Sequence, residues 1–306
     1  NAGEIANKGI EASLSFVPVK TKNFTWDASV NFAKNDNEVV KLHDEVKDFE
    51  LASARWANAS IYASEGQPYG VIVGKKLKRT EKGDVIFENG LPTFDDKVSV
   101  LGNGNYDFTL GFRNAFNYKN LSMSVLFDMK FGADIYSMSA MQSHVNGTSK
   151  ETLEGRQEWY SSEQKRQSAG VPAGNWIATG GYVGKGVMAI KNDDGEMIYV
   201  PNNVCVDPAK YWQALQTTSP EPFIYDNSFV KLREISLSYN CPKKWFVHTP
   251  IESITLSAYG RNLLLIYSNV DNIDPESSYN NGNGQGFEYG SLPSRRTFGF
   301  GINVKF

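Results

Sequence analysis

Hydrophobic and polar residues alternate one by one along several stretches of this chain. In residues 121–131 all six odd positions are apolar and four of the five even positions are polar. With 41% hydrophobic residues in the chain, six apolar positions out of six would arise by chance about 0.5% of the time. A period of two places successive side chains on opposite faces of a sheet, so the stretch predicts a strand with one apolar and one polar face.

The same period returns elsewhere and predicts an all-β, antiparallel fold. The chain closes on five alternating apolar positions from Phe298 to Phe306. The other alternating stretches are residues 10–16, 24–32, 108–112, 235–239 and 254–258.

The connections between these predicted strands alternate between short and long. Short connections cover residues 19–23, 119–120 and 241–250, whereas the long ones cover about 34–105, 132–228 and 268–295. Structureless loops beyond about 15 residues are uncommon in compact domains. Short turns at one end and long loops at the other are typical of outer-membrane β-barrels.

The long loops carry helix signals of their own. Thr148 with Glu151 has the spacing of a capping box and predicts a helix to about Gln167. Asp207 before Pro208 predicts an N-cap and a second helix, which would end near residue 216.

Two further pairs of short segments predict strands within these loops. Residues 187–191 and 197–200 flank an Asn-Asp-Asp-Gly turn and predict a small hairpin. Residues 69–79 and 84–87 fit either two more strands of the main sheet or another loop hairpin.

Composition excludes several classes of protein. The mean hydropathy is −0.40 and the longest aliphatic or aromatic run is five residues, Leu263 to Tyr267, which excludes a membrane-spanning helix of about 20 residues. A net charge of −3 provides no positive electrostatic field that would attract the phosphates of a nucleic acid. Two cysteines and three widely spaced histidines offer neither a disulfide framework nor a zinc site.

Alternation alone leaves two interpretations open, a soluble sheet protein and a membrane β-barrel. The polar faces are mostly Ser and Gly rather than the charged residues of a water-facing sheet. An 11-residue strand rising about 3.3 Å per residue and tilted about 45° spans roughly 25 Å, the height of a barrel's lipid-facing band. The predicted strand ends are also aromatic, as in the girdles of such barrels: Phe116, Tyr118, Trp245, Phe246 and Tyr267.

The strand count is also informative. We count seven to nine strands, an odd number if the first and last both run toward the periplasm, whereas single-chain bacterial barrels have even counts. We therefore expect a segment of a larger barrel, whose first strand lacks its neighbour.

Charged residues on the polar faces have two interpretations. Asp128, Lys130 and Glu234 could form an acid–base set, but charges along a barrel lumen are the commoner arrangement, and we predict no enzymatic activity. We expect five residues to face the lumen: Arg113, Ser124, Asp128, Lys130 and Glu234. Asp274-Pro275-Glu276 with Asp271 predicts a turn or, alternatively, a calcium site. We predict no cofactor.

Aromatic residues are concentrated in the longest loop. They could stack on sugar rings or contact a protein partner, or they could pack a small core of the loop itself. These candidate substrate or lid contacts are Trp159, Tyr160, Trp176, Tyr182, Tyr211 and Trp212.

Five sequence blocks together resemble a known family. They are Asn1–Glu11, Asp226–Tyr239, Tyr259–Leu263, Asp274–Glu276 and Arg296–Phe306. In this order they resemble the C-terminal third of SusC/RagA-like TonB-linked outer-membrane transporters of Bacteroidetes-type bacteria.

The resemblance implies a fold and a function. It implies that residues 1–306 form the C-terminal part of a 22-stranded barrel, with long extracellular loops and with the family's plug domain outside this chain. It implies import of glycans or peptides under a SusD-like lipoprotein lid, driven by the TonB complex through the missing N-terminal part. It also implies that Phe306 is the assembly signal for the outer membrane. The alternative function is a soluble or surface carbohydrate-binding β-domain.

Overall fold

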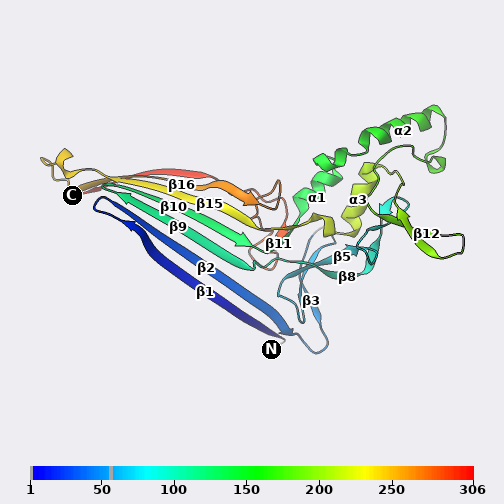
Figure 1. The fold of residues 1–306 in the computed structure, drawn as a ribbon, viewed down its shortest axis with the longest axis horizontal. Coiled ribbons are helices and arrows are strands. Elements are labelled where there is room, and N and C mark those ends of the chain that lie inside the picture. The colour runs from blue at the N-terminus through cyan, green and yellow to red at the C-terminus, as the bar shows by residue number, and fades with distance from the viewer. Residues whose placement is uncertain (1–2, 55–57) are drawn as a thin grey trace.

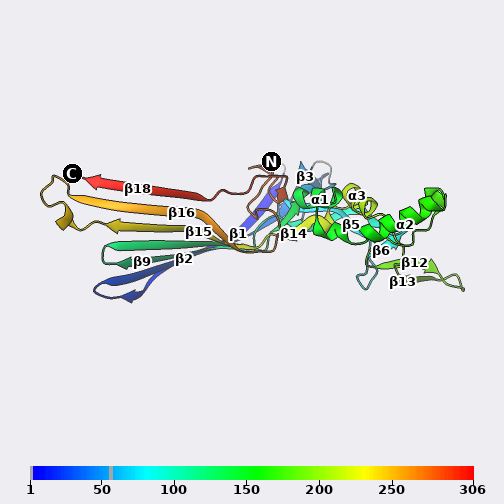
Figure 2. The same cartoon turned by 90° about the horizontal axis from the view of Figure 1, so that it is seen from above.

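A sheet of seven antiparallel strands forms one half of the molecule (Figures 1 and 2). The computed structural model describes residues 3–54 and 58–306, so Asn1 and Ala2 of the first family-like block lie outside the described residues. We call this sheet the wall sheet. Its strands, in spatial order, are β1 (Glu4–Lys20), β2 (Phe24–Lys41), β9 (Phe108–Tyr118), β10 (Leu121–Phe131), β15 (Phe229–Asn240), β16 (Ser253–Ser268) and β18 (Thr297–Lys305).

The wall sheet confirms the predicted fold class and the odd strand count. Each strand pairs with its predecessor in the wall, and within the described residues the sheet stays open between β1 and β18. Short turns join strands at one end, as at Lys119, whose φ of 52° closes the two-residue link between β9 and β10. The long connections leave from the other end.

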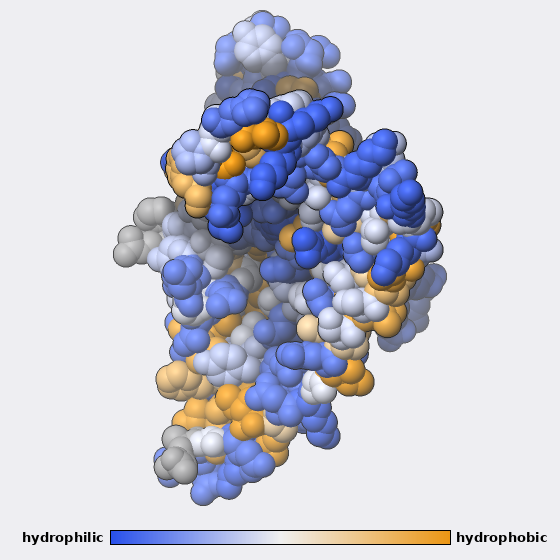
Figure 3. Space-filling view, turned by 90° about the vertical axis from the view of Figure 1, so that its left-hand side faces the viewer, coloured by the Kyte–Doolittle hydropathy of each residue, from blue (hydrophilic) through white to orange (hydrophobic). Residues whose placement is uncertain are grey.

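The two faces of the wall sheet differ as the alternation predicts. On β18 the apolar positions are largely uncovered, and Phe300 is 88% exposed. Figure 3 looks at the turn end of the sheet and shows apolar patches on the lower half of that view. An exposed apolar face of this kind needs an apolar surrounding, since each fully buried large side chain gains about 1.5–3 kcal/mol.

The three long loops fold together into what we call the loop module, at the right of Figure 1. It contains helices α1 (Met138–Val145), α2 (Arg156–Ser168) and α3 (Pro208–Thr218), and 3₁₀ turns at Lys150–Leu153, Ala173–Asn175 and Glu221–Phe223. A further 3₁₀ turn, Lys243–Trp245, lies at the turn end of the wall. Among the described residues, the loop module also contains three small sheets. The first consists of β3 (Asp48–Ser53), β4 (Ser60–Ser64), β5 (Val71–Leu77) and β8 (Phe94–Asn103). The second is β14 (Ile224–Asp226), β11 (Asp134–Ser137) and β17 (Phe287–Glu288). The third is β13 (Met197–Pro201), β12 (Val187–Lys191), β6 (Ile86–Glu88) and β7 (Leu91–Pro92).

The loops are joined by strand pairing and by one shared core. β17 of the third loop pairs in parallel with β11 of the second, and β6 of the first pairs in parallel with β12 of the second. All three loops contribute to one buried cluster: Ala54, Ala59, Ile61, Ile72, Tyr136, Met141, Trp212, Leu215, Phe223 and Phe287. The loop module is therefore a packed unit rather than three separate connections.

Some local predictions are confirmed and others are wrong. The hairpin of β12 and β13 is confirmed, and Asp207 caps α3 by accepting a hydrogen bond from the backbone N–H of Ala209 at 2.9 Å. The prediction of two extra strands in the main sheet is wrong, because β5 and β6 belong to two different sheets of the loop module. The alternative, a loop hairpin of these two segments, is present only at its tip, where a single bridge joins Arg79 and Val85.

The predicted capping box is wrong. The hydroxyl of Thr148 donates to the carbonyl of Ser143, the Glu151 carboxylate lies 2.9 Å from Nε2 of His144, and α2 begins only at Arg156. Helix α1, whose N-cap is Ser137, was not predicted from the sequence.

No helix in the described part of the chain is long and apolar enough to cross a membrane. Cys205 and Cys241 are both free.

Candidate functional site

The predicted lumen residues share the polar face of the wall sheet. Nε of Arg113 donates to the hydroxyl of Ser124 at 3.1 Å, across β9 and β10. Lys130 lies over the ring of Tyr106, with Nζ 5.2 Å from the ring centroid. Glu234 accepts a hydrogen bond from Nε of Arg261 at 2.7 Å.

A bulge in β15 adds a cation to this face. On β10 the partners of Leu126 and Phe127 are Glu234 and Leu232, so Arg233 is the extra residue. A bulge breaks the strict alternation of sides. Arg233 therefore lies on the same face as its neighbour Glu234, where its guanidinium pairs with the carboxylate of Asp128.

Five charged residues form what we call the charge cluster, at the loop end of the wall: Asp128, Lys231, Arg233, Asp274 and Glu276. Nζ of Lys231 lies 2.6 Å from Oδ1 of Asp274 and 2.7 Å from Oε2 of Glu276. Nη2 of Arg233 lies 2.6 Å from Oε1 of Glu276. The cluster fastens the loop between β16 and β18 to strands β10 and β15.

The charge cluster is well shielded from water. The side chains of Lys231 and Asp274 are 7% and 8% exposed. Burial raises the pKa of the Asp274 carboxyl, but hydrogen bonds from Lys231 and Ser294 lower it by more, so its pKa lies below the ordinary range. Burial also raises the pKa of Glu276, and Arg233 and Lys231 lower it by more. Both carboxyls are therefore ionised at neutral pH.

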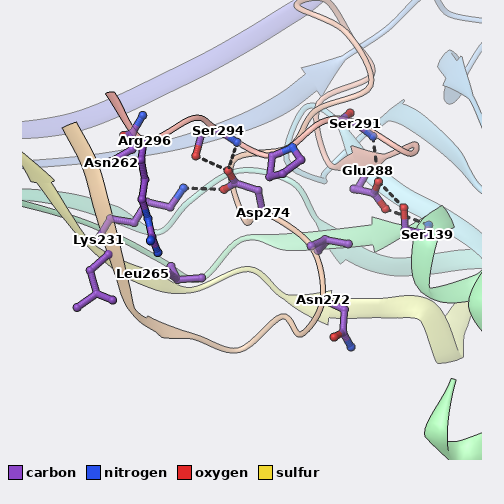
Figure 4. Close-up of a pocket in the computed structure, with 13 residues that line it drawn as sticks. Ser139, Lys231, Asn262, Leu265, Asn272, Asp274, Glu288, Ser291, Ser294 and Arg296 are labelled. Atoms are coloured by element: carbon purple, nitrogen blue, oxygen red, sulfur yellow. Dashed lines mark hydrogen bonds and ion pairs between the residues drawn. The ribbon is translucent and has the colours of Figure 1, made fainter. Parts of the chain in front are cut away.

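A cavity of about 300 Å³ adjoins the charge cluster (Figure 4). Asp274 lies between Arg296 and Asn262 on one side and Glu288 and Ser139 on the other. The lining includes apolar Leu264, Leu265, Ile273 and Pro293. A second cavity of about 370 Å³ is lined by Pro275 and Glu276 together with Tyr106 and Lys130.

Glu288 joins the loop of the charge cluster to helix α1. Its carboxylate is buried and accepts hydrogen bonds from the hydroxyl of Ser137 at 2.8 Å, and from the backbone N–H and hydroxyl of Ser139 at 3.0 and 2.8 Å. A carboxylate at a helix N-terminus is favourable because it meets unpaired N–H groups and the positive end of the helix dipole. Residues 269–296 thus bridge the wall sheet and the loop module.

The calcium alternative has no support from the described residues. Asp274 and Glu276 already pair with Lys231 and Arg233. Over the described ranges, no group of three or more His, Cys, Asp and Glu residues is placed to hold a metal ion.

The predicted loop aromatics are placed differently from one another. Trp212 is 8% exposed and lies in the shared core. Its ring centroid is 5.1 Å from that of Tyr211, and the ring centroids of Tyr211 and Tyr182 are 4.4 Å apart. The indole N–H of Trp176 donates to Ser162 at 3.1 Å. These four therefore take part in packing within the loop module, and their contact with a substrate or lid stays a prediction. Tyr160 is 60% exposed on α2, and contact with a substrate or lid stays a prediction.

Lys231, Arg233 and Glu288 were not predicted from the sequence as site residues. Lys231 and Arg233 occupy the odd positions of a strand whose odd positions 235, 237 and 239 are apolar. Two charged residues at positions where the strand pattern expects apolar ones indicate that the alternation shifts before residue 235. Phe306 follows β18 and is exposed, and its role as an assembly signal stays a prediction.

The chain is similar to known outer-membrane receptors, although no family model matches it. It is 26% identical over 340 residues to TonB-dependent receptor P3 of Formosa agariphila, which covers all of this chain and 29% of that protein. TonB-dependent receptor SusC of Bacteroides thetaiotaomicron is 27% identical over 139 residues, 40% of this chain and 14% of that protein.

Solved structures give the same fold. The RagAB peptide transporter matches with a TM-score of 0.64 at 18% identity, over 100% of this chain and 30% of that chain. The RagAB peptide importer in its 'closed-closed' state matches with a TM-score of 0.63 at 16% identity, with the same coverage. The chain spans about three tenths of the length of the proteins that match all of it. These findings confirm the predicted resemblance: the chain is an outer-membrane protein similar over its whole length to part of a SusC/RagA-like TonB-linked transporter.

Proposed function

We propose that this chain forms part of the wall and the extracellular loops of a TonB-dependent transporter that imports glycans or peptides with a SusD-like lipoprotein. In this proposal residues 1–306 are the C-terminal barrel part, and the TonB complex acts through other parts of the polypeptide. The observation that carries the proposal is the match of the whole chain to about 29% of TonB-dependent receptor P3.

The two faces of the wall sheet support this arrangement. In the proposal, exposed Phe300 and its neighbours meet lipid, and the polar face with the charge cluster lines the passage. The five predicted lumen residues keep that role as a proposal. A soluble β-domain would expose the same apolar face to water, so the outer membrane accounts better for the sheet.

The loop module is the part that we propose meets the lid. It stands at the end of the wall from which the long connections leave, and its shared core gives it a fixed shape. The RagAB structures are a peptide transporter and a peptide importer, which supports peptides as one substrate class, and glycans stay as the second class that the family resemblance implies.

The test is uptake by cells that carry the native polypeptide. Deletion of its gene should abolish growth on one class of polymer, glycan or peptide, as sole nutrient, and complementation should restore it. Dissipating the proton gradient should stop uptake while binding persists. Uptake that survives both the deletion and the lost gradient would contradict the proposal.

Loss of the terminal aromatic tests the assembly role of Phe306. Removing Phe306 should lower the amount of heat-modifiable barrel in the outer membrane, with Phe306→Tyr as the matched control that keeps the terminal aromatic. Equal barrel levels in the truncated and native proteins would contradict that role.

A further inference from the structure

A cavity within the loop module lies where α1 ends and where α2 and α3 begin. Its volume is about 300 Å³, at the lower end for ligand pockets and suited to one small ring. Its lining combines two indole rings, Trp159 and Trp212, with polar Asn146, Arg156 and Asp207. Asn146 and Arg156 are exposed, so the cavity opens at the surface.

Arg156 and Asp207 keep part of their hydrogen-bonding capacity free. One terminal nitrogen of Arg156 donates to the carbonyl of Gly147 at 2.9 Å and to the hydroxyl of Thr152 at 2.8 Å. Oδ1 of Asp207 caps α3. Within the part of the chain that the structure describes, the other guanidinium nitrogens and the second carboxylate oxygen have no hydrogen-bond partner.

The charges of the cavity favour a neutral ligand. The carboxylate of Asp207 and the guanidinium of Arg156 carry opposite charges, so an anion attracted by one is repelled by the other. A purely apolar ligand would displace water from both groups without replacing its hydrogen bonds, which is costly. Two kinds of ligand without a net charge satisfy both groups: one that donates and accepts hydrogen bonds through neutral groups, and a zwitterion such as a short peptide.

A sugar ring meets these demands within a single small group. Each hydroxyl can donate to a carboxylate oxygen and accept from a guanidinium N–H. The C–H face of the ring is apolar and matches the flat surface of an indole. Trp159 is only partly buried on α2 and lines the cavity, whereas Trp212 is held in the shared core, so Trp159 is the more accessible of the two rings.

We propose that this cavity binds one ring of a neutral sugar, with Trp159 against the ring face and with Asp207 and Arg156 on neighbouring hydroxyls. The site belongs to the loop module and not to the polar face of the wall sheet. It does not require transport, because a loop module that binds sugar would do so in a barrel that imports nothing. Binding is therefore measured on the purified protein, and uptake is not the readout.

The experiment titrates the full native polypeptide, purified in detergent, with maltotriose, cellotriose, laminaritriose, mannotriose and xylotriose. We expect at least one trisaccharide to bind with a Kd of about 0.1–1 mM by calorimetry. Trp159→Ala should weaken binding at least about tenfold, whereas Trp159→Phe, which keeps a flat ring, should stay within about threefold. Gln164→Ala is the matched control, since Gln164 is exposed on the same helix outside the cavity, and it should bind as the native protein does.

Asp207→Asn separates binding from folding. Asn caps a helix about as well as Asp, so α3 should persist while one charged acceptor is lost and sugar binding falls. If Trp159→Ala fails to fold, Asp207→Asn decides the result.

Three outcomes would overturn the proposal. The first is that no neutral trisaccharide binds at about 10 mM, ten times the weakest expected Kd. The second is binding that is unchanged in both Trp159→Ala and Asp207→Asn, which would place the sugar elsewhere. The third is that trialanine or trigalacturonate binds while the neutral sugars do not, and that Trp159→Ala abolishes that binding.

Discussion

Two phenylalanines show how differently the two halves of this chain are built. Phe300 in the wall sheet is 88% exposed, whereas Phe223 in the loop module is 1% exposed. The wall sheet turns apolar residues outward and gathers ion pairs on its polar face, while the loop module buries apolar residues around one core. The same physical rule gives both results, because the wall meets lipid and the loop module meets water.

The bridge between the halves is polar. Residues 269–296 are held to the wall by the charge cluster and to the loop module by Glu288. Interactions of this kind are directional, so they can fix the loop module in one position relative to the wall.

Breaking the charge cluster should give the largest effect. Lys231→Met removes the cation that faces Asp274 and Glu276 and leaves buried negative charge, which should cost about 3–5 kcal/mol of unfolding free energy. Urea unfolding of the purified protein measures it. Lys34→Met is the matched control, since Lys34 is exposed in its pair with Asp36, and it should cost less than about 1 kcal/mol. Similar losses for the two variants would show that the cluster does not hold the bridge.

Charge on the two faces of one strand should separate lipid from lumen. Val125→Lys on the apolar face should cost about 2–4 kcal/mol near the middle of the membrane, whereas Ser124→Lys on the polar face should leave the barrel folded. The yield of heat-modifiable barrel in outer membranes measures both. Equal losses would contradict the assignment of the faces.

Acidic conditions should weaken the bridge between the wall sheet and the loop module, whereas neutral conditions should leave it intact. The pKa values of Asp274 and Glu276 are lowered in the folded protein, so the unfolded state takes up protons first as the pH falls through about 4. Their contribution to stability should be complete above about pH 5 and should be lost as the pH falls through the folded pKa values. Urea midpoints from pH 7 to pH 3 test this. The Asp274→Asn, Glu276→Gln double variant should show a weaker fall, and an identical profile would refute the assignment.

The cap of α3 should give the smallest effect. Asp207→Ala should cost about 1 kcal/mol, because the N–H of Ala209 loses its acceptor, whereas Asp207→Asn should cost little. Protease sensitivity of the loop module in intact cells reports the change. Because the cap lies outside the wall, barrel yield should be unaffected in both variants, and a loss of barrel would show that the two halves fold together.

The wall sheet could be predicted because its signal is local. A period of two along β10 or β18 is visible within about ten residues, and the turn between β9 and β10 is adjacent in sequence. The lumen candidates Asp128 and Glu234 followed from the same count.

The loop module and the charge cluster depend on contacts that are distant in sequence. β17 pairs with β11 across about 150 residues, and Asp274 reaches Lys231 across 43. The bulge at Arg233 shifts the alternation, which made Lys231 look like a residue of the apolar face. The capping-box prediction at Thr148 failed because the Thr148 hydroxyl and the Glu151 carboxylate both bond to α1, a helix that was not predicted.

The direct test of the central claim is the surroundings of neighbouring side chains on β10. With Cys205 and Cys241 replaced by Ser, nitroxide labels are placed at Val125→Cys and Ser124→Cys in the full protein in membranes, and their collisions with oxygen and with a water-soluble nickel chelate are measured. The account predicts that the label at 125 collides mainly with oxygen, which concentrates in lipid, and that the label at 124 collides mainly with the chelate. Equal accessibility at the two positions, or the reverse preference, would contradict it.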